Sequence, residues 1–237
     1  MHLSSFWVGV MQIIWINILL SGDNAVVIAL ACINLPKRVR FWGMTLGAGV
    51  AILLRIVFAL IVSTLMTLPY LKVIGGLALI YIAVKLLVPE DENGKDDSIE
   101  ASERLWRAVR VVAIADVIMS LDNVIAIAAA ARGHAALYVF GLAFSVPLII
   151  AGARLVMALL TRFPVLVWAG GGLLGWIAGQ VIATDPVVRG DLILTYGEDV
   201  AHLVEYLAAT AGAIIVVASG WMLRRNQESK SNVDVAG

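Results

Sequence analysis

Seven long apolar stretches are the feature that most constrains how this chain can fold. A helix that crosses a bilayer needs about 20 largely apolar residues, because only helical hydrogen bonds can satisfy its backbone within the lipid. The stretches that meet this length lie at about residues 6–32, 41–65, 69–88, 109–131, 136–158, 164–183 and 205–223. The sequence therefore predicts an all-α membrane protein with seven transmembrane helices.

The composition agrees with this prediction and argues against several other classes of protein. Apolar residues make up 61% of the 237 residues and charged residues only 14%, whereas a soluble domain carries about a quarter charged residues. The formal net charge is zero, so the expected partner is the lipid bilayer and not a nucleic acid. Cys32 is the only cysteine, which excludes an internal disulfide and a thiolate metal cluster.

Two hydrophilic segments divide the chain into predicted parts. Residues 89–108 are expected to form a charged cytoplasmic linker between residues 1–88 and 109–183, which contain three predicted helices each. Residues 184–203 are expected to form an extracytoplasmic loop. A seventh helix and a cytoplasmic tail are predicted within residues 204–237.

Basic residues predict how the helices are oriented in the membrane. Lys and Arg gather after the first, third, fifth and seventh predicted helices, as at Lys37, Arg104, Arg162 and Arg224. Short loops rich in these residues remain on the cytoplasmic side. We therefore expect a multi-pass protein with its N-terminus outside and its C-terminus in the cytoplasm.

One polar motif occurs twice, as SGDN at residues 21–24 and as SLDN at residues 120–123. The same spacing pairs further polar residues, Asn17 with Asp116 and Arg55 with Arg154. Such residues are rare inside membrane helices, so their alignment in one register indicates a duplicated unit of three helices. Because three is an odd number, the two copies would cross the bilayer in opposite directions, as in many secondary transporters. The predicted fold is thus two inverted three-helix repeats plus one extra C-terminal helix.

The charged residues within these segments need partners. On insertion scales each would cost about 2.5–3.5 kcal/mol at the centre of a membrane helix. All of them are expected to face inward, namely Asp23, Asp116, Asp122, Arg55 and Arg154. Two Asp–Arg pairs that only hold helices together are one interpretation. Three carboxylates against two arginines leave one carboxylate unmatched, however, and a cation or a proton could balance it.

Helical spacing predicts two polar stripes, formed by Asn17, Ser21 and Asn24 and by Asp116, Ser120 and Asn123. Asp23 and Asp122 lie about 120° away from these stripes in an ideal helix. Either the two aspartates face a different neighbour, or each helix breaks locally and turns them inward. Gly22 would permit such a break in the first helix, whereas Leu121 gives no such help in the fourth.

The types of polar group favour a hard cation. Carboxylate, amide and hydroxyl oxygens suit Mg²⁺, Ca²⁺ and Mn²⁺. The three histidines, His2, His134 and His202, fall at the ends of predicted segments. Zinc or copper would ordinarily recruit nitrogen or sulfur ligands, so neither is the expected substrate.

The paired SGDN and SLDN motifs, Asp116 upstream of the second, and the seven-span outline resemble the TerC family of integral membrane proteins, from about Phe6 to Leu223. The resemblance implies export of manganese from the cytoplasm across the bacterial inner membrane. It implies a set of metal-binding residues, Asp23, Asn24, Asp116, Asp122 and Asn123. Supporting polar or charged residues would be Asn17, Ser21, Ser120, Arg55 and Arg154. Because Asn17 stands where the second copy has Asp116, the two half-sites are electrically unequal.

The sequence leaves other functions open. No ATP-binding motif appears, so export by alternating access would use a coupled gradient, with proton exchange at the aspartates as the natural candidate. Arg55 and Arg154 could instead bind a small anion or organic solute, as the tellurium-resistance name of the family invites. Two membrane aspartates could also form an intramembrane aspartyl hydrolase. The motifs of such hydrolases are absent, so we expect neither an enzyme nor a prosthetic group.

Overall fold

The computed structural model describes the backbone of Met11 and of residues 22–65, 68–88, 97–130 and 135–234. It describes the side chains of these residues except at 59–65, 97–100, 121–130, 135–145 and 228–234. This part of the chain forms eight helices and no strand. The prediction of an all-α protein is confirmed for the residues that the structure describes.

The helices group into two compact units. Unit 1 comprises Met1–Leu68 and Lys95–Arg162, and unit 2 comprises Pro69–Gly94 and Phe163–Gly237. Each unit therefore combines helices from both halves of the predicted repeat. The division of the sequence into two repeats joined by a linker stays a prediction.

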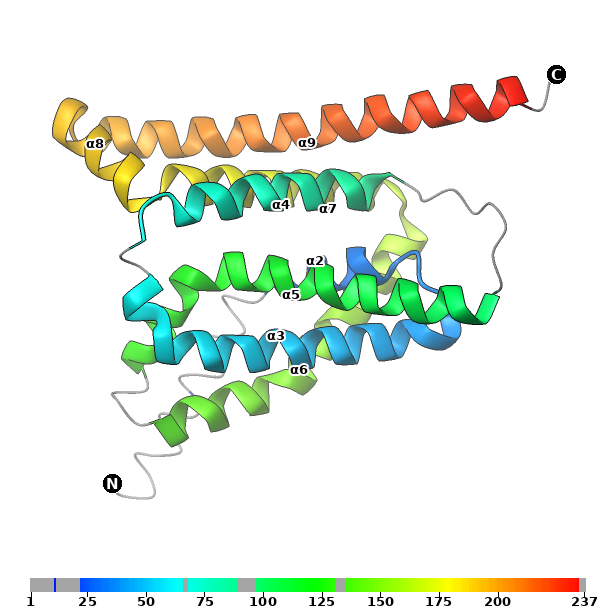
Figure 1. Cartoon of the computed structure of the whole chain (residues 1–237), viewed down its shortest axis with the longest axis horizontal. Helices are drawn as coiled ribbons and strands as arrows, with labels where there is room; N and C mark the ends of the chain where they lie inside the picture. Colours follow the sequence, from blue (N-terminus) through cyan, green and yellow to red (C-terminus); the bar gives the residue numbers. More distant parts are fainter. Residues whose placement is uncertain (1–10, 12–21, 66–67, 89–96, 131–134, 235–237) are drawn as a thin grey trace. The chain divides into compact units, whose positions relative to one another are not determined.

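Unit 1 contains four helices, namely α2 (Gly22–Cys32), α3 (Lys37–Leu65), α5 (Asp97–Ala130) and α6 (Ala135–Arg162). Helix α3 packs along α5, and α2 packs against both α6 and α5 (Figure 1). Arg40 fixes the connection between α2 and α3, because its Nη2 donates hydrogen bonds to the carbonyl oxygens of Ile33 (2.8 Å) and Leu35 (3.1 Å). Basic side chains commonly satisfy carbonyls at the C-terminal end of a helix in this way.

Unit 2 contains the other four helices, α4 (Leu71–Leu87), α7 (Val165–Ala183), α8 (Pro186–Tyr196) and α9 (Glu198–Asp234). Helix α7 packs against both α4 and α9 (Figure 1). Gly175 and Gly179 of α7 face Gly212 and Ala208 of α9, and a Cβ atom at Gly179 would overlap the main chain of Ala208. Small residues at such contacts let the backbones of two membrane helices approach closely.

Replacing Gly179 by alanine is expected to destabilise unit 2, because the added methyl group has no room against α9. Overpacking of this kind costs about 1–3 kcal/mol, which a lower melting temperature of the purified protein would reveal. Gly190→Ala is the matched control, since no heavy atom lies within 4 Å of a Cβ built at Gly190. Equal melting temperatures for the two variants would contradict the close contact of α7 with α9.

The predicted loop at 184–203 is wrong for most of its length, because it contains α8 and the start of α9. Asp185 caps α8 by accepting a hydrogen bond from the backbone nitrogen of Val187 (3.0 Å), and Pro186 occupies the first turn. Both residues are favoured at helix starts. The segment is too short and too polar to span a membrane, and a search for apolar length therefore predicts a loop there.

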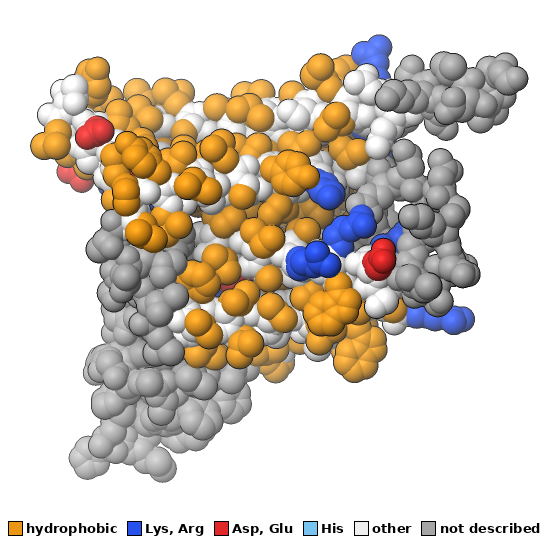
Figure 2. Space-filling view, viewed as in Figure 1, with side chains coloured by type: hydrophobic (Ala, Val, Ile, Leu, Met, Phe, Trp, Pro, Cys, Tyr) orange, Lys and Arg blue, Asp and Glu red, His pale blue; other side chains and the backbone are white. Residues whose placement is uncertain are grey.

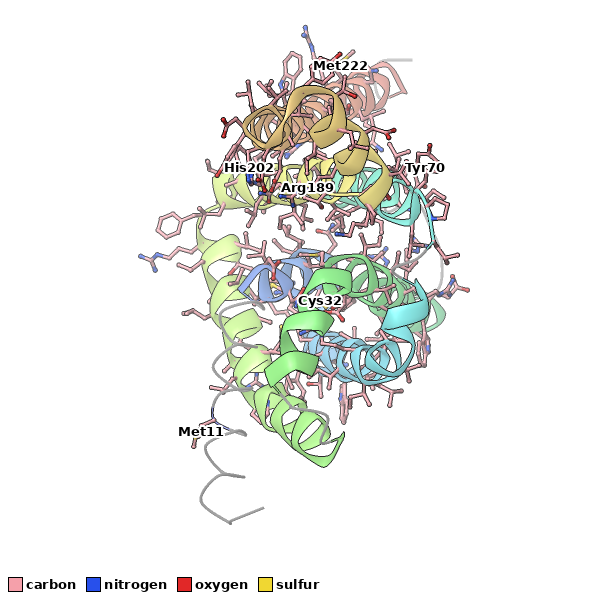
Figure 3. The ribbon with its side chains drawn as sticks, turned by 90° about the vertical axis from the view of Figure 1, so that its left-hand side faces the viewer. Met11, Cys32, Tyr70, Arg189, His202 and Met222 are labelled. Atoms are coloured by element: carbon pink, nitrogen blue, oxygen red, sulfur yellow. The ribbon has the colours of Figure 1, made fainter. Side chains whose placement is uncertain are left out.

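Asp185 also joins α8 to α4. Its side chain is fully buried, and its Oδ2 accepts a hydrogen bond from the backbone nitrogen of Lys72 (3.2 Å). Tyr70 lies in the turn before α4 (Figure 3). Its backbone is left-handed, with a φ of 60°. This contact between α4 and α8 depends on tertiary packing, so the sequence did not predict it.

Helices α5 and α9 extend furthest beyond their predicted bounds. Helix α5 begins at Asp97, so residues 97–108 of the predicted linker are helical, while residues 89–96 lie outside the described chain. Helix α9 runs from Glu198 to Asp234 and not only over 205–223. Apolar length identifies only the part of a helix that lipid could surround, and polar helix-forming residues can continue the helix beyond it.

Three helical segments of the described chain are long and apolar enough to cross a membrane, Lys37–Phe58, Val165–Ala183 and Glu198–Gln227. Apolar side chains cover most of the described surface on the face shown in Figure 2, and many large ones are exposed. An aqueous surface would not favour so many exposed apolar groups. The arrangement of seven spans in two inverted repeats stays a prediction.

Candidate functional site

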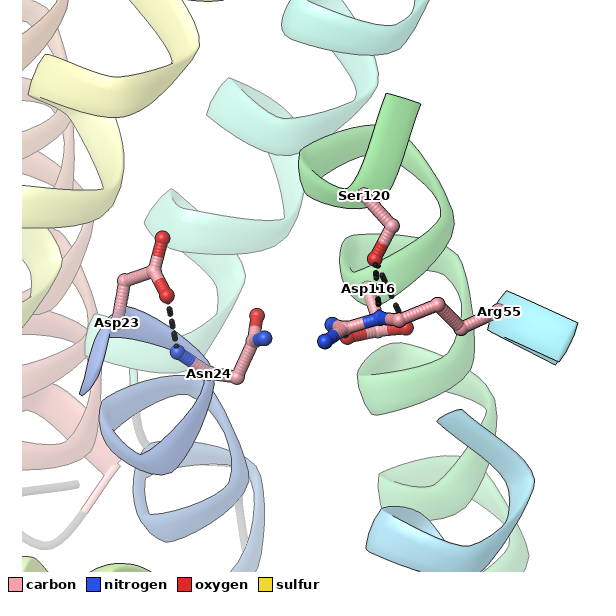
Figure 4. Close-up of polar contacts among 5 residues, drawn as sticks. All are labelled: Asp23, Asn24, Arg55, Asp116 and Ser120. Carbon is pink, nitrogen blue, oxygen red and sulfur yellow. Dashed lines mark hydrogen bonds and ion pairs between the residues drawn. The ribbon is translucent and has the colours of Figure 1, made fainter. Parts of the chain in front are cut away.

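Three helices of unit 1 bring five polar or charged residues to one region (Figure 4). Asp23 and Asn24 lie at the start of α2, Arg55 lies in α3, and Asp116 and Ser120 lie one helical turn apart in α5. The packing of α3 along α5 and of α2 against α5 brings these helices together. All five are among the site and supporting residues predicted from the sequence.

Arg55, Asp116 and Ser120 form a closed network. A guanidinium nitrogen of Arg55, Nη2, forms an ion pair with Oδ1 of Asp116, and its Nε donates a hydrogen bond to Ser120 Oγ (3.0 Å). Ser120 Oγ in turn donates to the other carboxylate oxygen of Asp116 (3.1 Å). The three residues are 2%, 4% and 1% exposed, respectively. Buried charges persist when they are paired and hydrogen-bonded in this way.

The side chain of Asn24 points toward this network (Figure 4). Asn24 is only 5% exposed, and its amide nitrogen has no hydrogen-bond partner among the described residues. An unsatisfied buried polar group costs about 1–3 kcal/mol. Because this nitrogen is a hydrogen-bond donor, it is a candidate contact for an acceptor on a neighbouring polar group or on a ligand, and it would not itself bind a cation.

Asp23 lies on the other side of Asn24 from the Arg55–Asp116 pair (Figure 4). One of its carboxylate oxygens accepts a hydrogen bond from the backbone nitrogen of Asn24 (2.7 Å). The carboxylate is partly buried, and no basic side chain in the described part of the chain forms an ion pair with it. Asp23 is thus the carboxylate of this cluster whose charge remains available to a cation.

The helical spacing left two alternatives for Asp23 and Asp122: each faces a different neighbour, or its helix breaks and turns it inward. In α2, Asp23 faces away from the side on which Asn24 meets α3 and α5 (Figure 4). In the second copy of the motif, α5 continues as a regular helix through Asp122 and Asn123. A break in α5 is therefore not the way in which Asp122 could be turned inward.

Several predicted site residues cannot be assigned contacts. Asn17 and Ser21 lie outside the described residues, as do the side chains of Asp122 and Asn123. Within the described chain, no group of three or more His, Cys, Asp or Glu side chains could hold a metal ion. The metal site that the sequence predicts from both motifs therefore stays a prediction.

The expectation that Arg154 faces inward is wrong. Arg154 is exposed on α6, and its guanidinium carbon lies 4.4 Å from the centre of the Phe41 ring. The neighbouring positions Ala153, Met157 and Leu160 form the buried stripe of this helix, which places Arg154 beside the stripe and not on it. A cation over an aromatic face is a favourable contact, and the sequence alone did not identify Phe41 as the partner.

These helices and their apolar surfaces define a class of protein, the multi-pass integral membrane proteins. Comparison with known proteins gives the family: residues 2–230 match the Integral membrane protein TerC family, and the chain belongs to it.

Relatives share different lengths of the chain. It is 39% identical over 180 residues to the uncharacterized membrane protein YjbE of Bacillus subtilis (strain 168), which covers 76% of this chain and 81% of that protein. It is 28% identical over 138 residues to the UPF0053 inner membrane protein YoaE of Escherichia coli (strain K12), covering 51% of this chain but only 27% of that protein. No solved structure matches the chain.

Proposed function

We propose that the protein transports a divalent metal cation and that its substrate is Mn²⁺, exported from the cytoplasm. The observation that carries this proposal is the Asp23 carboxylate, which forms no ion pair among the described residues and adjoins the buried amide of Asn24. Carboxylate and amide oxygens are ligands that Mn²⁺ accepts. By the repeat, Asp122 and Asn123 would supply the corresponding ligands from α5.

The charges of the cluster support a divalent substrate. Arg55 already compensates Asp116, and the exposed Arg154 lies over Phe41, so it does not supply a second buried counter-charge. Asp23 and Asp122 would then contribute two negative charges, which one divalent cation neutralises. In this arrangement Asp116 lies near the metal ligands but is paired with Arg55 and does not itself bind the metal.

Transport would follow alternating access between two inverted repeats in the bacterial inner membrane, with the N-terminus outside and the C-terminus in the cytoplasm. Exchange of protons at the aspartates would supply the energy for export against a gradient. The contacts of unit 1 are compatible with this scheme, since α3 pairs with α5 and α2 with α6, each pair joining the two halves of the sequence. Sites between repeats are common in secondary transporters.

Export of a small anion has less support. That function would require Arg55 and Arg154 to bind the anion together. Arg55 is buried in an ion pair with Asp116, and Arg154 is exposed in contact with Phe41. An anion would have to displace the Asp116 carboxylate to reach Arg55.

Manganese accumulation in cells tests the proposal directly. Cells that produce the protein are expected to hold several-fold less manganese, after growth in excess Mn²⁺, than a matched strain without it. Elemental analysis of washed cells provides the measurement. Equal manganese contents, with the protein present in the membrane, would contradict the proposal. A parallel arm with tellurite tests the anion alternative.

A further inference from the structure

Helices α3 and α5 run in the same direction along each other at the end of unit 1 where both begin. A Cβ atom built at Gly43 of α3 would lie 3.4 Å from the side chain of Leu105 of α5, and one built at Gly47 would lie 3.4 Å from that of Val112. Positions near 43 and 105 therefore lie at the same level along the two helices.

Two exposed tryptophans lie at this level. Trp42 adjoins Gly43 and is 56% exposed, and Trp106 adjoins Leu105 and is 52% exposed. Each shares a helix face with an exposed arginine four residues away, Arg38 before Trp42 and Arg110 after Trp106. Neither arginine forms a hydrogen bond or an ion pair in the part of the chain that the structure describes.

These side chains lie where a bilayer would meet water. The apolar helical segment long enough to cross a membrane, Lys37–Phe58, begins only five residues before Trp42. Figure 2 shows the visible Lys and Arg side chains over α3 and α5 toward the end at which both helices begin. Tryptophan is enriched at the membrane boundary, and the long side chains of lysine and arginine reach from apolar surface to the headgroups.

The charge at this boundary is strongly positive. Among the described side chains of residues 37–46 and 101–111, Glu103 is the one acidic group. Other acidic residues of this region, Asp97 and Glu100, lie in the first turn of α5, farther from its apolar part. The basic residues of the two segments are Lys37, Arg38, Arg40, Arg104, Arg107 and Arg110.

We propose that a basic–aromatic surface, formed by Lys37, Arg38, Trp42, Trp106 and Arg110, binds the headgroups of anionic phospholipids. A guanidinium donates paired hydrogen bonds to phosphate oxygens. Clusters of Lys and Arg next to a membrane helix attract lipids of net negative charge. A zwitterionic headgroup has a phosphate too, but its own positive charge opposes these basic side chains. The surface therefore favours an anionic phospholipid.

Lipid retention by the purified full-length protein tests this surface. The protein is reconstituted in vesicles of equal amounts of phosphatidylglycerol and phosphatidylcholine and extracted in mild detergent, and mass spectrometry measures the phospholipids that remain bound. The natural protein should retain about five times more phosphatidylglycerol than phosphatidylcholine, and the double variant Arg38→Gln with Arg110→Gln about equal amounts.

A matched control removes two positive charges from unit 2. Lys85 is exposed on α4 and Arg189 is half-buried on α8, so Lys85→Gln with Arg189→Gln should keep the lipid preference within about twofold of that of the natural protein. Arg38→Lys with Arg110→Lys keeps both charges and should keep most of the preference. An unchanged preference in the glutamine variant, or an equal loss in the control, overturns the inference. The basic residues would then only orient the helices in the membrane.

A second measurement needs no variant and so does not depend on how a variant folds. Phosphatidylglycerol should raise the melting temperature of the natural protein more than phosphatidylcholine or soluble glycerol phosphate does at the same concentration. Equal shifts from the three compounds would overturn the inference, because the protein would then not distinguish an anionic membrane lipid from a neutral one or from a free phosphate.

Discussion

The Asp23→Asn variant is expected to reduce manganese efflux to the level of cells without the protein. Asparagine has nearly the same shape as aspartate, so α2 should keep its start and its packing. The substitution removes one of the two negative charges available to a divalent cation, together with a strong oxygen ligand. The Asp23 carboxylate has no described ion-pair partner, so losing it should cost function much more than stability. Retention of Mn²⁺ by preloaded cells measures the effect.

A matched control is available on α8. Asp191 is exposed, so Asp191→Asn removes one carboxylate without touching the site, and it should retain efflux close to that of the natural protein. Asp122→Asn, in the second motif, should match the loss seen for Asp23→Asn. Efflux within about twofold of normal in both Asp23→Asn and Asp122→Asn, at equal protein in the membrane, would exclude the aspartates as the ion ligands.

Apolar length predicted the bounds of some described helices but not those of α5, α8 and α9. The predicted segments at 69–88 and 164–183 agree with α4 and α7 to within a few residues. Helix α8 was missed, although Asp185, Pro186 and Gly197 are ordinary start and stop signals. A search for membrane spans finds only apolar stretches of about 20 residues. Short helices and polar helical extensions do not meet this criterion, because their side chains are suited to water.

The sequence predicted which site residues share a face of one helix, but not which residues on different helices contact each other. The spacing of Asp116 and Ser120 correctly placed both on one face, where they form a hydrogen bond. No pattern in the sequence gave the pairing of Arg55 with Asp116, because it depends on the register between α3 and α5. The repeat suggested equal roles for Arg55 and Arg154. Their surroundings differ, since one is buried and the other is exposed over Phe41.

Removing either charge of the Arg55–Asp116 pair is expected to destabilise the protein strongly. Arg55→Gln leaves the Asp116 carboxylate buried without its cation, and Asp116→Asn leaves the guanidinium buried without its anion. Breaking a buried pair from one side costs about 3–5 kcal/mol. Each single variant should therefore show a clearly lower melting temperature in detergent than the natural protein.

The double variant Arg55→Gln with Asp116→Asn should lose less stability than the sum of the two single variants, because it leaves no unpaired charge. Residues in direct contact commonly show such coupling, of about 0.5–3 kcal/mol. Ser120→Ala removes only hydrogen bonds and should cost about 1 kcal/mol. Additive losses in the double variant would mean that Arg55 and Asp116 act independently. The buried network would then be no more than two separate polar contacts, and the charge balance assigned to the site would lose its structural basis.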